Sequence, residues 1–140
     1  MEISTVAVGT DGSGTASEAV QAAADLARHF DAKLVLLSAF QGSGSKQSDE
    51  PSEREWAVSP SARVKEILAR TESGLKSDGV DCSTQIDEGD PAEVIVRLAE
   101  ECGADLLVIG NRGMQRRVLG SVPNTVTHRA PCSVLVVKTT

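Results

Sequence analysis

Aromatic residues are scarce in this chain: Phe30, Phe40 and Trp56 are the whole complement, and tyrosine is absent. A core with so few rings has to be built from aliphatic side chains, which suits parallel strands covered by helices on both faces. Long apolar runs are also missing, and none approaches the roughly 18 residues of a membrane-spanning helix. We therefore expect a cytoplasmic protein without a membrane partner.

Cysteine and histidine are few and scattered. The three cysteines, Cys82, Cys102 and Cys132, form no C-x-x-C pair, and the two histidines do not cluster with them. An odd number of widely spaced cysteines predicts neither a disulfide framework nor a zinc site. We expect reduced thiols that pack as small hydrophobic side chains.

Positive charge is in deficit, because 14 Lys and Arg stand against 20 Asp and Glu and give a net charge of -6 at pH 7. A nucleic acid as bulk partner would require a cationic face, so none is expected. The length of 140 residues predicts one domain, residues 1–140. A domain of this size buries about two-thirds of its unfolded surface and needs no metal or disulfide to fold.

Apolar runs and helical patterns alternate along the chain. The strands are expected at 3–8, 33–40, 80–87, 105–109 and 133–138, and the helices at 15–30, 62–77, 91–102 and 121–129. This alternation predicts an α/β fold, a single doubly wound five-stranded parallel sheet with helices on both faces. Residues 41–59 are polar and aperiodic, which predicts a surface loop, in which Trp56 either docks on the body of the protein or helps to cover a ligand.

The segment from Ile109 to Val122 has the composition of an anion-binding loop. It leaves a predicted strand, contains three glycines and three arginines, and ends where a helix is expected to begin with Ser121 as its cap. Glycine lets main-chain N–H groups approach a ligand, and the first N–H groups of a helix have no partners within it. The alternatives are a turn that only changes direction and arginines that are simply solvated. The candidate phosphate-binding residues are Gly110, Arg112, Gly113, Arg116, Arg117, Gly120, Ser121 and Val122.

A second polar turn, Gly9-Thr10-Asp11, follows the first predicted strand. In doubly wound sheets, ligands bind at the carboxyl ends of the strands, where the winding reverses. If the first and fourth strands are neighbours, both turns face one crevice, with room for a sugar near Asp11 and phosphates near residues 113–121. The chain has no G-x-x-x-x-G-K-[ST] motif, and no nucleophile, base and orienting group converge, so we do not expect an enzyme.

Several of these segments resemble the universal stress proteins, whose fold is Rossmann-like, and the resemblance covers essentially the whole chain. They are V-G-T-D-G-S at 8–13, D-L-L-V-I-G at 105–110, G-S-V at 120–122 and A-P-C-S-V-L-V-V at 130–137. Nucleotide-binding members carry Gly, two residues, Gly, nine residues, Gly and then Ser or Thr. Here Gly110 and Gly113 keep the first spacing, but only six residues, 114–119, precede Gly120.

The resemblance implies an adenine-nucleotide-binding module in stress adaptation or signalling. It places Asp11 near the ribose or a phosphate-bound Mg²⁺, Gly9 and Thr10 beside the adenine, the main chain of Ala39 against the base, and Gly110 by the ribose. Gly113, Gly120, Ser121 and Val122 match the triphosphate loop. Arg116 or Arg117 could supply charge that a longer loop supplies through its backbone.

The resemblance leaves the ligand open between ATP, with or without Mg²⁺, and cyclic AMP. Some members with a similar G-S-V-P-N ending bind cyclic AMP, which needs a smaller phosphate pocket. The alternatives are a member that does not retain ATP and acts through dimerisation and protein partners, or a weak ATPase.

The last predicted strand, 133–138, carries four consecutive apolar residues, Val134–Val137. An open edge of that kind invites pairing, and family members commonly pair this strand with its twin. We therefore expect a homodimer through it, unless the strand lies inside the sheet or is covered by residues 41–59.

Overall fold

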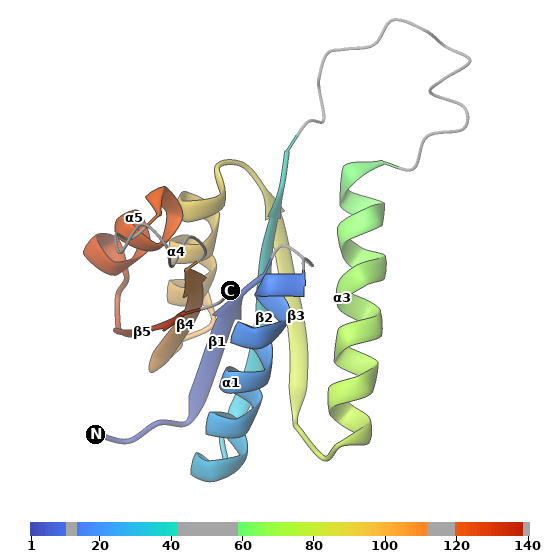
Figure 1. Cartoon of the computed structure of the whole chain (residues 1–140), viewed down its shortest axis with the longest axis vertical. Helices are drawn as coiled ribbons and strands as arrows, with labels where there is room; N and C mark the ends of the chain where they lie inside the picture. Colours follow the sequence, from blue (N-terminus) through green and yellow to red (C-terminus); the bar gives the residue numbers. More distant parts are fainter. Residues whose placement is uncertain (11–13, 42–58, 112–119, 139–140) are drawn as a thin grey trace, which may run out of the picture.

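The computed structural model describes residues 1–10, 14–41, 59–111 and 120–138, with the side chains of 14–16 excepted. Within them, five strands alternate with four helices (Figure 1). The strands are β1 (Thr5–Gly9), β2 (Lys33–Phe40), β3 (Cys82–Glu88), β4 (Leu106–Asn111) and β5 (Ser133–Lys138). The helices are α1 (Gly14–Phe30), α3 (Pro60–Ser77), α4 (Pro91–Glu101) and α5 (Ser121–Arg129).

The strands form one parallel sheet in the order β3-β2-β1-β4-β5. From β1 the chain builds outward through β2 to β3, and then returns to the other side of β1 for β4 and β5. The winding therefore reverses between β1 and β4, which pair directly, with Ala7 opposite Leu107. This confirms the predicted doubly wound sheet. It places β5 at an edge, so the alternative position of this strand inside the sheet is wrong.

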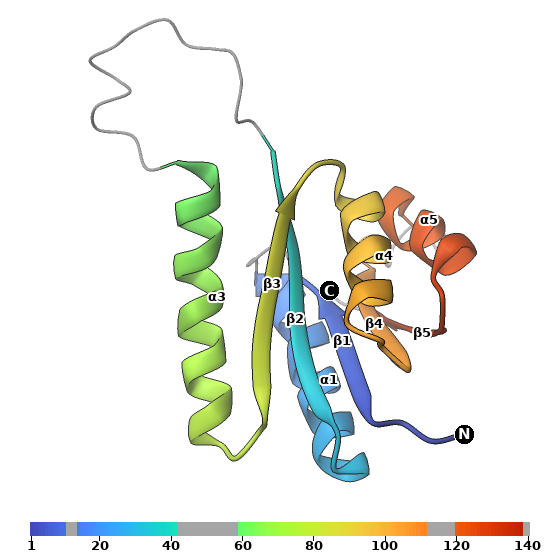
Figure 2. The same ribbon diagram turned by 180° about the vertical axis from the view of Figure 1, so that it is seen from behind.

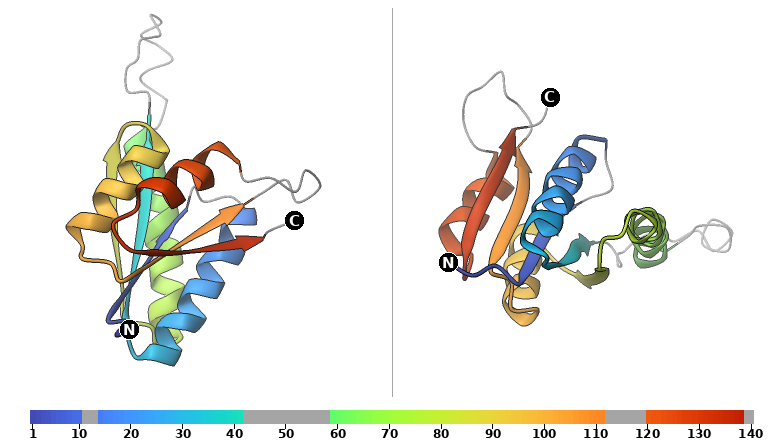
Figure 3. Two further views of the ribbon diagram at one scale, coloured as in Figure 1. Left: turned by 90° about the vertical axis from the view of Figure 1, so that its left-hand side faces the viewer. Right: turned by 90° about the horizontal axis from the view of Figure 1, so that it is seen from below.

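Two helices cover each face of the sheet. Figure 2, seen from behind, shows α4 in front of the sheet and α1 behind it, and Figure 3 shows the layers edge-on. Successive residues of a strand point to opposite faces, so Val6 and Val8 join the core under α1 and α3, while Ala7 joins the core under α4 and α5. The helix residues that close these cores include Val20 and Leu68 on the first face and Ile95 and Val126 on the second.

The predicted elements agree with the structure to within two residues at each end. Helix α3 begins earlier than expected, because the Ser59 hydroxyl accepts a 3.1 Å hydrogen bond from the Ala62 N–H and Pro60 takes the first helical position. Residues 42–58, including Trp56 and most of the predicted loop, lie outside the described residues. No helix in the described ranges is long and apolar enough to cross a membrane.

The three cysteines are free thiols, as predicted. Cys82 is buried, and Cys102 and Cys132 are partly buried. Burial raises the pKa of all three thiols, that of Cys82 to about 11. They are therefore protonated at neutral pH and pack as small hydrophobic groups.

Candidate functional site

The ends of β1 and β4 lie side by side at the carboxyl edge of the sheet. Val8 pairs with Val108, so the chain leaves both strands at adjacent points, toward Thr10 on one side and Gly110 on the other. The strand ends that lead into the two predicted turns therefore lie at the same edge, as the prediction of a shared ligand site requires. Helix α5 begins at this edge as well, because the Gly120 N–H at its start is hydrogen-bonded to Asn111, the last residue of β4.

Thr10 is held by the end of the neighbouring strand β2. Its N–H donates a 2.9 Å hydrogen bond to the Leu37 carbonyl, and its carbonyl accepts a 2.6 Å hydrogen bond from the Ser38 hydroxyl. Thr10 and Ser38 are both buried. The main chain that leads into Asp11 is thus fixed before any ligand contributes, although Asp11 itself lies outside the described residues.

Gly9 faces helix α4 and the core. A Cβ at this position would lie 2.8 Å from Cδ1 of Ile95 and 2.9 Å from Cδ1 of Ile109. Distances under about 3.0 Å are not tolerated without a shift of the neighbours, because protein interiors are close-packed. The packing of α4 against the sheet therefore accounts for glycine at this position.

The start of α5 differs from the prediction in one respect. The N-cap is Gly120, which has φ -66° and ψ 174° and makes no side-chain cap hydrogen bond, and Ser121 is the first helical residue. The expectation that Ser121 caps the helix is therefore wrong. An extended backbone of this kind is open to any residue, so the conformation does not require glycine at position 120.

The N-terminus of α5 is secured by a residue that the sequence analysis missed. Oδ1 of Asn111, the last residue of β4, accepts a 2.9 Å hydrogen bond from the Gly120 N–H. The next donors, the N–H groups of Ser121 and Val122, have no acceptor among the described residues. Pro123 has no N–H, and the Asn124 N–H donates to the Gly120 carbonyl at 2.9 Å.

These donors lie at the positive end of the α5 dipole, which favours an anion. Ser121 is exposed and Val122 is partly exposed at this end.

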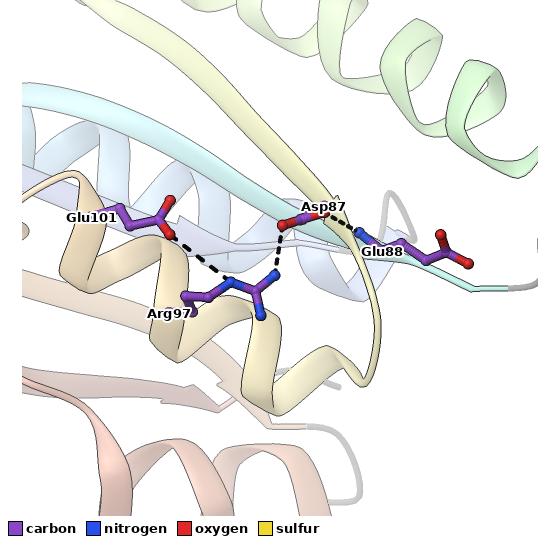
Figure 4. A network of polar contacts seen from close by, with 4 residues as sticks. All are labelled: Asp87, Glu88, Arg97 and Glu101. Carbon is purple, nitrogen blue, oxygen red and sulfur yellow. Dashed lines mark hydrogen bonds and ion pairs between the residues drawn. The ribbon is translucent and has the colours of Figure 1, made fainter.

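Ala39 lies at the same carboxyl edge of the sheet, in β2, on the side of β1 away from β4. It is partly buried near the end of β2 and pairs with Asp87 of β3. Asp87 is anchored to α4, because its Oδ2 lies 2.6 Å from Nη2 of Arg97 and its Oδ1 accepts a 2.7 Å hydrogen bond from the Glu88 N–H (Figure 4). The Glu88 N–H and the Arg97 guanidinium hold the pKa of Asp87 below its ordinary value. The network ties the β2–β3 end of the edge to α4.

The predicted site residues thus fall into two groups. Gly9, Thr10, Ala39, Gly110, Gly120, Ser121 and Val122 are described and share the carboxyl edge of β2, β1 and β4 or the start of α5. Asp11, Arg112, Gly113, Arg116 and Arg117 lie outside the described residues. Across the described ranges, no group of three or more His, Cys, Asp or Glu side chains could hold a metal ion. Because Asp11 lies outside the described residues, its expected Mg²⁺ role stays a prediction.

Sequence reasoning missed Ser38 and Asn111. In the described part of the chain, the buried polar or charged residues are Thr5, Thr10, Ser38 and Asn111, and all but Thr5 lie at the carboxyl edge. Buried polar groups need partners, so their concentration at one edge marks a place where side chains hold the backbone in position. The available signal was a lone polar residue at the end of each of two apolar strands.

Comparison with known proteins agrees with this architecture. The strand order defines a doubly wound α/β protein whose winding reverses between β1 and β4. The model of the universal stress protein family matches residues 2–138. The chain is 39% identical over 145 residues to the universal stress protein Rv1636 of Mycobacterium tuberculosis, with 97% of each chain covered. The chain therefore belongs to the universal stress protein family.

Solved structures extend the likeness to three dimensions. A universal stress protein crystallised in complex with cAMP is 34% identical, with a TM-score of 0.76 and full coverage of both chains. An Arabidopsis thaliana family member with AMP bound is 24% identical, with a TM-score of 0.77, 98% of this chain covered and 92% of the other. At 24% identity, the likeness to the Arabidopsis thaliana protein supports the fold alone.

Proposed function

We propose that this chain binds an adenine nucleotide and acts as a ligand-binding module in stress adaptation or signalling. The observation that carries the proposal is the opening of α5, where the N–H groups of Ser121 and Val122 have no acceptor among the described residues and follow Gly120, which is bonded to Asn111 at the end of β4. The 34% identical relative crystallised with cAMP supports the choice of an adenine nucleotide.

In this proposal the phosphate binds at the start of α5, and the ribose and base extend along the carboxyl edge. The N–H groups of Ser121 and Val122, with the Ser121 hydroxyl, give three donors for one phosphate group. The ribose lies near Gly110 and the turn after Thr10, and the base lies toward Ala39. The spacing of six residues before Gly120 favours cyclic AMP, which needs a smaller phosphate pocket, over ATP.

Calorimetry with cyclic AMP, and with ATP in the presence and absence of Mg²⁺, tests the proposal. We expect cyclic AMP to bind most tightly. If ATP bound only in the presence of Mg²⁺, and if Asp11→Asn abolished that binding, a metal-bound triphosphate would be favoured instead. No heat of binding for either nucleotide at millimolar concentration would refute the proposal.

Ser121→Ala separates binding from folding. Because Ser121 is exposed and does not cap α5, its loss is expected to change the free energy of unfolding by less than about 0.5 kcal/mol. The same change removes a phosphate donor and is expected to weaken cyclic AMP binding about fivefold to tenfold. Equal affinity in the variant and the parent would remove the hydroxyl from the site.

The proposed role is binding without catalysis. ATP incubated with the protein is therefore expected to be recovered intact, as measured by the release of inorganic phosphate against a protein-free control. Steady release that disappears in Asp11→Asn would favour the weak ATPase instead.

A second candidate function, association through β5, is favoured by the exposure of that edge. Leu135 is 39% exposed on a strand that pairs with β4 alone among the described strands. We propose that two copies of the chain pair through β5 and form a homodimer, with or without bound nucleotide.

A further inference from the structure

Asn111 joins two segments that are separated along the chain. It is the last residue of β4, only 8% of its surface is exposed, and its Oδ1 accepts the 2.9 Å hydrogen bond from the N–H of Gly120. Residues 112–119 run between these two points in the sequence. A single buried side chain therefore fixes the distance between the end of β4 and the start of α5.

Gly120 is held from both sides. Its N–H is bound by Asn111, and its carbonyl accepts the Asn124 N–H within α5 at 2.9 Å. Both main-chain groups of the residue immediately before Ser121 are thus engaged. The direction of the Ser121 and Val122 N–H groups relative to β4 follows from this arrangement, because they are the next two donors of the same helix.

We propose that Asn111 is a positioning residue for the phosphate end of the nucleotide site, and this rests on the proposed function. The hydrogen bond to Gly120 holds the α5 donors at the carboxyl end of β4 before the ligand arrives. A ligand then finds these donors already oriented, and the cost of ordering the helix end need not be subtracted from the binding free energy.

Two variants break the bond from opposite ends. Asn111→Ala removes the acceptor. Gly120→Pro removes the donor: φ is already -66° and a Cβ there meets nothing closer than 3.5 Å, while the ring Cδ takes the place of the N–H hydrogen and pushes the Asn111 amide away. Gly120→Pro also carries the test if Asn111→Ala does not fold. The matched control is Thr127→Val, which removes an exposed hydrogen bond from the Thr127 hydroxyl to the Asn124 carbonyl in the same helix.

Cyclic AMP and adenosine are the two probes, because they share the base and the sugar and differ in the phosphate. Each variant is expected to weaken cyclic AMP binding about tenfold, the size of one hydrogen-bond contribution, and to change adenosine binding by less than about twofold. The double variant is expected to lose no more than either single variant, because both changes break one bond. Thr127→Val is expected to bind both probes as the parent does.

Amide exchange tests the anchor without any ligand. In the nucleotide-free parent, the Gly120 amide is expected to exchange more slowly than in Asn111→Ala, because the hydrogen bond protects it. Thr127→Val is expected to leave this exchange rate unchanged.

Three results would overturn the role of Asn111 in a parent that binds cyclic AMP. These are unchanged cyclic AMP affinity in both variants, equal losses for cyclic AMP and adenosine, and additive losses in the double variant. A parent that binds neither probe would overturn the proposed function and this role together.

Discussion

The Ser38 hydroxyl donates a 2.6 Å hydrogen bond to the main-chain carbonyl of Thr10, so the end of β2 holds the turn that follows β1. The contact is dry, because the two residues are 2% and 8% exposed. With the bond from the Thr10 N–H to Leu37, both main-chain polar groups of Thr10 have partners in β2. The carboxyl edge of the sheet is thus organised by its own side chains.

Ser38→Ala is expected to lower the free energy of unfolding by about 1 to 2 kcal/mol, because it leaves the buried Thr10 carbonyl without its side-chain donor. Urea unfolding of the parent and the variant measures the difference. Ser83→Ala, at an exposed serine of β3, is the matched control and is expected to change stability by less than about 0.5 kcal/mol. Equal stability of the two variants would mean that the bond contributes nothing.

Gly9→Ala is expected to destabilise the protein by about 1 to 3 kcal/mol, because its Cβ would press on the Cδ1 atoms of Ile95 and Ile109. Thermal and urea unfolding measure the loss. Adding Ile95→Val removes the nearest of these atoms, so the double variant is expected to lose less than the sum of the two single variants.

Gly74→Ala is a control for this steric argument, because it is expected to change stability in the opposite direction. A Cβ at Gly74, inside α3, meets no atom within 4 Å. Gly74→Ala is therefore expected to stabilise the protein by about 0.5 to 1 kcal/mol through helix propensity. Destabilisation by both glycine substitutions would point to a backbone effect, and neutrality of Gly9→Ala would show that the isoleucines move aside at no cost.

The order and extent of the elements could be predicted because their signals are local. The unbroken run Leu34–Leu37 marks a strand buried on both faces. Asp90 followed by Pro91 marks the start of α4, and the structure shows the Asp90 carboxylate accepting the Glu93 N–H at 3.2 Å. The residues that cap a helix, or that make a strand apolar, lie within a few positions of one another. They can therefore be read directly from the sequence.

The finer geometry of the site depends on contacts that a local pattern does not contain. The hydrogen bond from Gly120 to Asn111 spans nine positions, and the bond from Ser38 to Thr10 spans 28. The Ser121 cap was predicted from residue type alone. It was wrong because Asn111 holds Gly120 in the N-cap position from outside the helix, and Ser121 then becomes the first helical residue.

Cys82 makes stability depend on pH in the alkaline range. Burial, and then the nearby Glu72 carboxylate, raise the pKa of its thiol from 9.0 to about 11, against the opposing effect of Lys76. Below pH 9 the thiol is protonated in both the folded and unfolded states, and stability does not depend on it. Between pH 9 and 11 the unfolded chain loses this proton first, so stability falls as pH rises.

The free energy of unfolding is therefore expected to drop between pH 8 and 10.5 by more in the parent than in Cys82→Val. Val keeps an apolar side chain at this position, and Glu72 and Lys76 are present in both proteins, so the difference isolates the thiol. Urea unfolding at the two pH values provides the measurement. Parallel pH profiles would mean that the buried thiol ionises as it does in the unfolded chain.

Leu135→Lys is expected to convert the proposed homodimer to monomer. Leu135 is 39% exposed on the edge strand β5, whereas Val134 and Val136 pack against the core under α4 and α5. A lysine on an edge strand opposes pairing with another chain, and two copies of it would repel each other across a two-fold axis.

Sedimentation velocity over a range of micromolar concentrations checks this prediction. The control is Ser83→Lys, which adds the same charge at an exposed position of β3, the opposite edge of the sheet. The parent and Ser83→Lys are expected to sediment as dimers and Leu135→Lys as a monomer with unchanged circular dichroism. Dissociation by Ser83→Lys but not by Leu135→Lys would move the interface to the β3 edge. A monomeric parent would show that the apolar edge of β5 does not pair at all.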